Sequence, residues 1–161
     1  WTPAPDDDQA DLYLRMTEEL ARRGLEAYEL SNFALPHFEA RHNARYWARE
    51  PYLGLGPSAH SYEPERRWSN GRDTRAWCEA IEAGRLDLEV DERLDHTQVR
   101  RERVLLGLRR REGIPVAWVT ERARWCEQAA RAGLLRREGD RWTATSEGWL
   151  VLDQMVAQLV D

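Results

Sequence analysis

The pattern that most constrains the fold is a helix signal followed by a glycine turn and a strand signal near the start of the chain. Residues 8–23 repeat apolar side chains every four positions, which predicts an amphipathic helix that Gly24 closes. The acidic run 6–8 is expected to cap it. Residues 25–30 alternate as a strand does, and 31–36 have loop chemistry. Helix, turn and strand together form an αβ unit, which is typical of parallel-sheet and barrel folds.

The middle of the chain predicts short strands and one helix. Residues 52–55 are expected to form a short strand, and 59–62 and 66–69 a hairpin around Glu63-Pro64. Residues 74–83 have helical periodicity. The charged run 89–92 lacks apolar periodicity and is interpreted as a connector, so we place a module boundary near residue 90.

The last seventy residues predict a second, mostly helical module at 91–161. A helix capped by Asp95 or Thr97 precedes a second helix over 116–131, and residues 134–145 suggest a two-stranded ribbon. A final helix over 146–160 is expected to begin with a Ser cap. The order of helices, ribbon and helix is typical of a winged-helix-like domain.

Composition indicates a globular protein of the cytoplasm. The 161 residues suffice for a core without disulfides, and no apolar run approaches the roughly 18 residues of a membrane span. The first residues are acidic, unlike a signal peptide, although a chain that begins with Trp1 is expected to be trimmed or to lack upstream sequence. The net charge of −5 argues against a general polyanion binder, even though all 24 basic residues are arginine.

The most chemically distinctive block combines His42, Asn43, Tyr46 and Trp47 with the small-residue loop at 54–59. Imidazole is well suited to ligate iron, and aromatic rings can stack on a flat macrocycle. The block therefore suggests a place for a planar cofactor. Ordinary roles stay open, because a histidine can be a hydrogen-bonded loop residue, aromatics can fill a junction, and glycines can simply allow a turn.

At this point the motifs resemble a known family. YELSNFALP, RHNARYW, YLGLGPSAHSY, VRRERVLLGLRRREGI and AGLLRREGDRWTATSEGWLVL, in that order, resemble the C-terminal part of the radical S-adenosylmethionine haem chaperones. These are relatives of oxygen-independent coproporphyrinogen III dehydrogenase. The resemblance implies a mixed α/β and α+β fold: residues 1–90 as the last βα elements of a partial (β/α) barrel, and 91–161 as the small winged-helix-like domain.

The resemblance also implies an activity and its cofactors. The activity would be binding haem and passing it to a haem-requiring acceptor, with a [4Fe-4S] cluster and S-adenosylmethionine in the full-length protein. The resemblance matches His42 to the haem-binding histidine of the family. From the motif we expect its Nε2 or Nδ1 on the iron, Asn43 orienting the loop, and Tyr46 and Trp47 shielding one haem face. The residues on the S-adenosylmethionine side would be Gly54, Gly56 and Ala59.

The cluster motif of the family, CxxxCxxC, is absent, because the two cysteines, Cys78 and Cys126, lie far apart. A site-differentiated cluster needs three thiolates, so this chain alone is not expected to be a radical enzyme. It is expected to be a C-terminal fragment, or to be held beside the missing N-terminal half of the barrel.

Two other functions remain open from the sequence. One is a porphyrinogen-acting radical S-adenosylmethionine oxidoreductase of the same superfamily. The other is a nucleic-acid-binding winged helix, favoured by wing arginines but opposed by the acidic residues among them. The run 109–111 is interpreted as a solvated helix face, and Glu29 as a hydrogen-bond acceptor that supports the fold.

Overall fold

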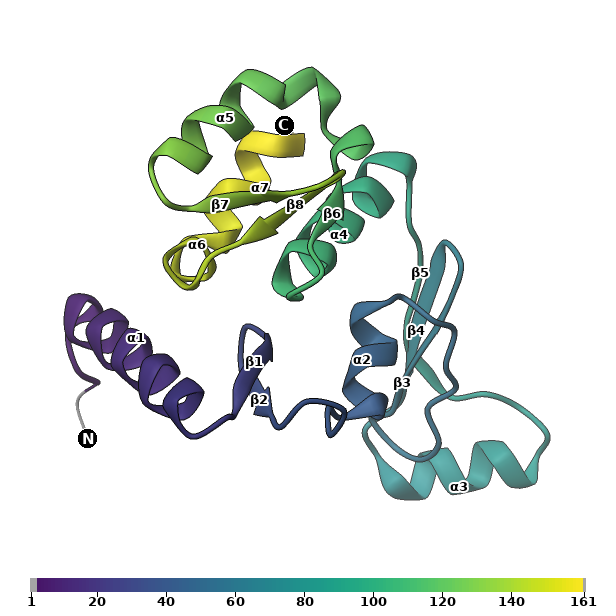
Figure 1. The fold of residues 1–161 in the computed structure, drawn as a ribbon. Coiled ribbons are helices and arrows are strands. Elements are labelled where there is room, and N and C mark those ends of the chain that lie inside the picture. Colours follow the sequence, from purple (N-terminus) through teal and green to yellow (C-terminus); the bar gives the residue numbers. More distant parts are fainter. Residues whose placement is uncertain (1–2, 161) are drawn as a thin grey trace. The chain divides into compact units, whose positions relative to one another are not determined.

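The structure is a computed structural model that describes residues 3–160 (Figure 1). The α-helices are α1 Asp6–Arg22, α2 Arg41–Trp47, α3 Thr74–Glu82, α4 His96–Arg109, α5 Ala123–Arg131, α6 Ser146–Leu150 and α7 Leu152–Val160. The strands are β1 Glu26–Glu29, β2 Asn32–Ala34, β3 His60–Glu63, β4 Arg66–Asn70, β5 Leu88–Arg93, β6 Ile114–Pro115, β7 Leu135–Glu138 and β8 Arg141–Ala144. Two 3₁₀ turns occupy Val116–Trp118 and Thr120–Arg122. No helix within residues 3–160 is both long enough and apolar enough to cross a bilayer.

The N-terminal segment begins with the predicted helix. α1 lies where the helix was predicted. Its N-cap is Pro5, which makes no side-chain hydrogen bond, and the acidic run lies in the first turn and does not cap the helix. There the carboxylates still stabilise the helix through their attraction to the positive end of its dipole. No residue of α1 is buried, and Leu12 is 68% exposed. Leu12 and Met16 of the predicted stripe are therefore exposed, and the half-buried side of the helix is instead formed by Tyr13, Leu14, Thr17 and Leu20.

The predicted strand is confirmed, but its pairing differs from expectation. β1 pairs antiparallel with β2, which forms where a loop was predicted, with Ala27 opposite Phe33. A parallel neighbour would need a crossover connection of a dozen or more residues, whereas β2 follows β1 after two. The three sheets formed by residues 3–160 are all antiparallel, so the fold is mixed α+β. The barrel elements expected from the resemblance are not shown.

The C-terminal module has the molecule's largest core. β8 lies between β6 and β7, and helices surround this small sheet (Figure 1). Its fully or almost fully buried side chains come from α4, α5, α7, the three strands and Val119 between the two 3₁₀ turns: Val104, Leu108, Ile114, Val119, Cys126, Ala129, Leu135, Trp142, Leu152, Met155, Val156 and Leu159. The predicted order of helix, helix, ribbon and helix is confirmed.

Inside this module Asp95 is the predicted cap that is used, and three other details differ from expectation. Asp95 is the cap of α4: its Oδ1 accepts from the Gln98 N–H at 2.8 Å while Gln98 Oε1 accepts from the Asp95 N–H at 2.8 Å, a capping box. The helix expected over 116–131 is two 3₁₀ turns followed by α5. The last helix is interrupted at Val151, and its cap is Thr145 rather than Ser146, since Thr145 Oγ1 accepts from the Gly148 N–H at 3.0 Å.

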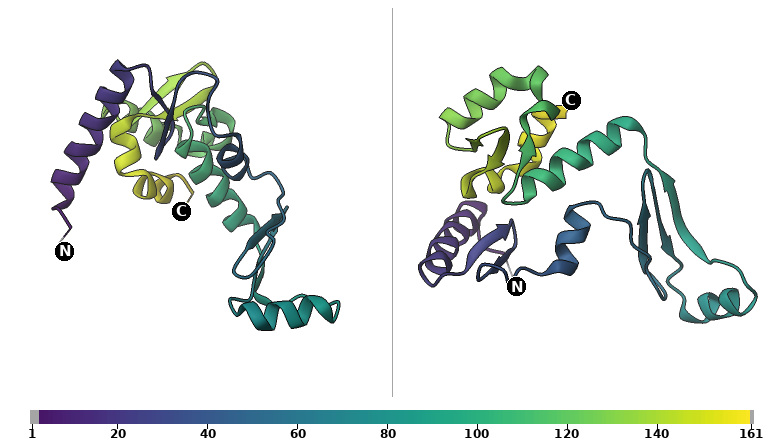
Figure 2. Two further views of the ribbon diagram at one scale, coloured as in Figure 1. Left: turned by 90° about the horizontal axis from the view of Figure 1, so that it is seen from below. Right: turned by 45° about the vertical axis from the view of Figure 1, so that its right-hand side comes forward.

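The middle of the chain forms the sheet β3–β4–β5, with its strands side by side in Figure 2. The predicted hairpin and the helix α3 are confirmed. The prediction of a connector at 89–92 was wrong, because these residues lie in β5 and pair with β4. Cross-strand ion pairs stabilise this charged strand: Arg66 lies 2.8 Å from Asp91, and Arg67 lies 2.9 Å from Glu92. The predicted strand at 52–55 is reduced to a single bridge between Tyr52 and Tyr62.

Two compact units result: the described residues up to Ala48 together with Arg101 onward, and Arg49–Arg100. The first contains the core of the C-terminal module, and the second a small core of Tyr62, Leu94 and Val99. The module boundary proposed near residue 90 stays a prediction.

Candidate haem-side helix and glycine loop

The HNARYW motif forms the short helix α2. Helical spacing places His42 and Tyr46 one turn apart on the same face. Their rings meet edge to face, with centroids 4.8 Å apart, and His42 Nε2 lies 3.1 Å from Tyr46 Oη. His42 is exposed. The candidate ligand is therefore an accessible imidazole whose orientation is fixed by a neighbouring phenol.

Asn43 and Trp47 belong to the other face of the same helix. They are also one turn apart, and both are half-buried. The Trp47 ring stacks under the guanidinium of Arg109, whose Cζ lies 4.3 Å from the ring centroid. The four candidate haem residues thus form two pairs: His42, which is exposed, with the half-buried Tyr46, and Asn43 with Trp47, called the inward pair because Trp47 packs on Arg109.

Beneath Arg109 lies a buried carboxylate that the sequence interpretation placed outside the site. Glu29, at the end of β1, is completely buried, and its Oε1 accepts from the Ser31 N–H at 2.9 Å and from the Asn32 side-chain amide. Its Oε2 lies 2.6 Å from Arg109 Nε in an ionic contact that lacks hydrogen-bond geometry. Arg109 Nη2 also donates to Ser31 Oγ at 3.0 Å.

These contacts confirm Glu29 as a hydrogen-bond acceptor that supports the fold, and they add an ion pair. For Arg109, the interpretation of a solvated face was wrong, because 22% of its side chain is exposed and its charge is paired. The only hint of this ion pair in the sequence was an acidic residue, Glu29, at the end of a predicted strand. Its partner lies eighty positions away in the sequence, so local pattern could not identify it.

A cavity of about 340 Å³ lies beside Trp47 and Arg109. Its walls are largely apolar and come from the turn after β1, from α2, from α4 and from the last two helices, including Leu30, Leu105, Leu106 and Leu152. The indole N–H of Trp47 is buried and meets no acceptor among the described residues. The inner face of α2 therefore borders an incompletely filled space.

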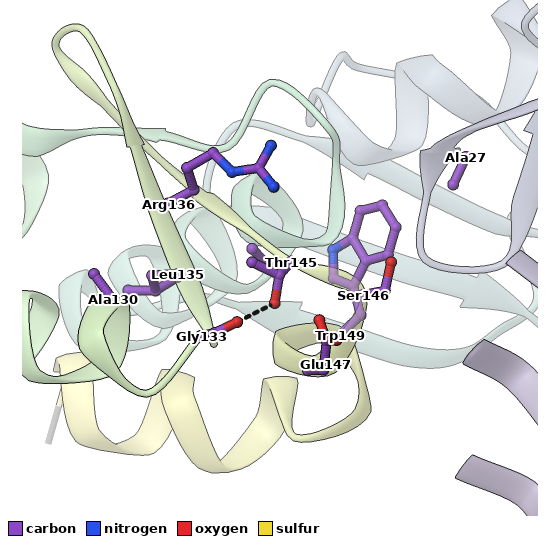
Figure 3. A pocket seen from close by; sticks show the side chains of 10 residues that line it. Ala27, Ala130, Gly133, Leu135, Arg136, Thr145, Ser146, Glu147 and Trp149 are labelled. Carbon is purple, nitrogen blue, oxygen red and sulfur yellow. Dashed lines mark hydrogen bonds between the residues drawn. The ribbon is translucent and has the colours of Figure 1, made fainter. Parts of the chain in front are cut away.

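A second cavity of about 600 Å³ lies along the ribbon and α6 and is drawn in Figure 3. Arg136 reaches over it from β7, and Thr145 Oγ1 donates to the Gly133 carbonyl at 2.6 Å at its floor. None of the residues in the HNARYW motif or the glycine loop lines it. It is lined by the C-terminal module together with Ala27 of β1, and the candidate haem residues do not line it.

The loop at 54–59 is held by polar contacts within its own unit. The Gly54 N–H donates to Ser61 Oγ at 2.9 Å, and Asn70 Nδ2 donates to the Gly56 carbonyl at 2.8 Å. Ala59 uses both backbone groups internally: its N–H donates to the Gly56 carbonyl at 3.3 Å, and its carbonyl accepts from the Asn70 N–H at 3.0 Å. The loop is therefore preformed.

Positions 54 and 56 of this loop each favour glycine, for different structural reasons. A Cβ at Gly54 would lie 2.1 Å from the carbonyl oxygen of His60, so no larger residue fits there. Gly56 has φ +100°, a backbone conformation that L side chains rarely adopt, and a Cβ there would meet nothing within 4 Å. Gly56 is thus the point of the loop with open space around it.

The residues present do not fit an iron–sulfur cluster. Among residues 3–160 no group of three histidine, cysteine or acidic side chains comes together as a metal site. Cys78 is exposed, while Cys126 lies in the core of the C-terminal module, where burial raises the pKa of its thiol to about 11. A buried neutral thiol is a poor cluster ligand, since the thiolate is the form that binds iron.

Known proteins resemble both the sequence and the fold. Residues 94–151 match the family described as the HemN C-terminal domain. The chain is 36% identical over 159 residues to the heme chaperone HemW of Mycobacterium tuberculosis (strain CDC 1551 / Oshkosh), covering 98% of this chain and 41% of that protein. It is 35% identical over 112 residues to HemW of Lactococcus lactis subsp. lactis (strain IL1403), covering 69% and 29%.

The fold resembles coproporphyrinogen III oxidase (HemN) from Escherichia coli, a radical SAM enzyme, with a TM-score of 0.68 at 16% identity. That match covers 98% of this chain and 42% of the other. The chain therefore spans about two fifths of the proteins that it matches over nearly its whole length. It belongs to the radical SAM HemW family and corresponds to the C-terminal region of its members.

Proposed function

We propose that this chain is the C-terminal part of a haem chaperone, which binds haem and passes it to a haem-requiring acceptor protein. The observation on which this rests is the exposed His42 on α2, in contact with Tyr46, in a chain 36% identical to a heme chaperone. Haem is the cargo in this proposal. The protein would act in the cytoplasm, as a companion of the N-terminal barrel half of its family.

The His42–Tyr46 contact engages Nε2, which supports Nδ1 as the iron ligand. When His42 Nε2–H donates to Tyr46 Oη, the lone pair of a neutral imidazole remains on Nδ1. A hydrogen bond to the second nitrogen also fixes the ring orientation, as it does for histidines that ligate metals elsewhere. We therefore propose Nδ1 of His42 as the ligand and Tyr46 as its orienting partner.

The exposed position of His42 suits a protein that must release its cargo. An acceptor can reach a haem held at the surface without unfolding the chaperone, whereas a haem enclosed by a core would first require an opening step. The inward pair, Asn43 and Trp47, then contributes through the position of α2 rather than by shielding a haem face.

The glycine loop would serve the S-adenosylmethionine side of the whole protein. Gly54, Gly56 and Ala59 would contribute backbone and a small surface there, and the internal hydrogen bonds of Ala59 leave its methyl group as the available contact. The cluster and its thiolates would come from the N-terminal half, because the cysteines of this chain do not fit that role.

Hemin titration tests the proposal. The purified chain, His42→Ala and the matched control His60→Ala are titrated with hemin while the Soret band is followed; His60 is likewise an exposed histidine, but it lies on β3. We expect binding by the chain and by the control, with a shifted Soret band and weaker binding in His42→Ala. Equal affinity and equal spectra in all three would refute the role of His42.

The two alternatives have weaker support. Acidic side chains lie beside two of the wing arginines, since Arg136 lies 3.6 Å from Glu138 and Arg137 lies 3.9 Å from Glu127, which disfavours nucleic-acid binding. A porphyrinogen-acting oxidoreductase remains the enzymatic alternative within the superfamily. Product analysis with the full-length protein distinguishes that activity from haem transfer.

A further inference from the structure

The contacts of the haem-side helix raise the question of how such a short element is held. α2 has seven residues, no side-chain cap and no buried residue. Helices shorter than about 12 residues are marginal in water by themselves. The direction in which α2 presents His42 therefore depends on contacts made by its inward face.

The strongest of these contacts ends in a buried charge. Trp47 stacks on Arg109 at 4.3 Å, and Arg109 Nε lies 2.6 Å from the completely buried Glu29. A buried carboxylate is tolerated when it is paired and hydrogen-bonded, as Glu29 is. Three segments are thereby joined through one guanidinium: α2, the end of α4, and the β1–β2 turn.

We propose that Arg109 and Glu29 are positioning residues for the haem site: the stack of Arg109 on Trp47 sets the orientation of α2 and so aims the His42 imidazole at the haem iron. This inference rests on the proposed function. His42 lies five positions before Trp47 on the same helix, so a rotation of Trp47 is transmitted directly to His42. Neither Arg109 nor Glu29 needs to touch haem.

The geometry explains why the central residue is arginine. One planar group simultaneously faces the Trp47 ring, meets Glu29 through Nε and donates to Ser31 through Nη2. Lysine offers a point charge on a flexible stem and cannot present a flat face and an edge together. Arg109→Lys should therefore keep much of the charge pairing and lose the fixed stack.

The test compares four proteins at saturating hemin: the chain, Arg109→Lys, His42→Ala and the control Arg110→Ala. Arg110 is the adjacent arginine and pairs with Glu112 at 3.0 Å, away from the Trp47 ring. Soret position and the spin state from electron paramagnetic resonance report the iron ligand, and thermal unfolding reports stability. We expect Arg109→Lys to bind hemin about 5- to 30-fold more weakly, as loss of a desolvated cation–π contact implies, and to shift toward the spectrum of His42→Ala.

Each outcome decides between roles. If His42→Ala changes the spectrum while Arg109→Lys changes only the melting temperature, Arg109 is merely structural and the inference is overturned, with the proposed function intact. If His42→Ala leaves the spectrum unchanged, the proposed function fails, and the inference falls with it. The control Arg110→Ala should match the parent chain, and a shift in it equal to that of Arg109→Lys would also overturn the inference.

A second variant covers the case in which Arg109→Lys does not fold. Trp47→Leu removes the stack from the side of α2 and leaves the ion pair between Arg109 and Glu29 in place. It should reproduce the spectral shift and the 5- to 30-fold weaker hemin binding. A folded Trp47→Leu chain with the parent spectrum would overturn the inference.

Discussion

The C-terminal module and the ninety residues that precede it are stabilised in different ways. The module has a contiguous core drawn from three helices and all three strands. The preceding segment has no buried residue in α1 or α2, and its contacts include the Glu29–Arg109 pair, the Tyr13–Leu30 hydrogen bond, the cross-strand ion pairs of β5 and a small cluster around Tyr62. A core is robust to the loss of one polar contact, whereas a segment held by few polar contacts is not. The candidate haem helix lies in the less robust part.

The largest contrast is expected for leucines in the two parts. Leu159→Ala, in the core of the C-terminal module, should lower the free energy of unfolding by about 2–5 kcal/mol, because it leaves a cavity at a fully buried site. The matched control Leu12→Ala, on the exposed stripe of α1, should change it by less than about 0.5 kcal/mol. Urea unfolding measures both, and equal losses would contradict the comparison.

The next largest effect concerns the buried ion pair. Arg109→Ala should cost about 3 kcal/mol of stability, because it leaves the Glu29 carboxylate buried without its cation. The control Arg111→Ala breaks the pair with Glu26, which lies at 2.9 Å and is about half exposed on both sides, so less than about 1 kcal/mol is expected. Similar costs for both variants would show that burial of Glu29 does not matter.

The sequence predicted the parts of the fold that depend on near neighbours. α1, the Asp95 cap of α4 and the β3–β4 hairpin all follow from residues a few positions apart. β5 was missed because the residues that make its charges acceptable, Arg66 and Arg67, lie about 25 positions earlier. A charge-rich run has no apolar alternation that would predict a strand. It forms one here because the neighbouring strand β4 supplies the opposite charges.

For the candidate site, too, the sequence predicted what lies within one motif and not the contacts between distant segments. The motif located His42 and Tyr46, which the structure places together on one helix face. It could not separate them from Asn43 and Trp47, because a motif does not specify which side of a helix is covered. Glu29 and Arg109 were assigned ordinary roles, since their relation depends on tertiary packing between β1 and α4.

A smaller effect is expected where α1 meets β1. Tyr13 Oη donates to the Leu30 carbonyl at 2.9 Å, and burial raises the pKa of the phenol. Tyr13→Phe should lower the free energy of unfolding by about 1 kcal/mol, since it removes one hydrogen bond and leaves the ring in place. The loss should appear as faster amide exchange in β1 and not in α7. Unchanged exchange in β1 would mean that α1 contributes nothing to the stability of that strand.

The smallest effect is expected from acid on the sheet β3–β5. Arg66 holds the pKa of the Asp91 carboxyl below its usual range, and Arg67 does the same for Glu92. Because both pKa values are lower in the folded chain than in the unfolded one, their stabilisation is complete above about pH 4 and is lost as the pH falls through the folded-state values. Both pairs are exposed, so the loss should be small and screened by salt.

Amide protection in β4 and β5, corrected for the intrinsic pH dependence of exchange, should fall between pH 5 and pH 3 while that of α7 is kept. Asp91→Asn should remove part of this pH dependence, and an unchanged profile in that variant would mean that the acid sensitivity arises elsewhere.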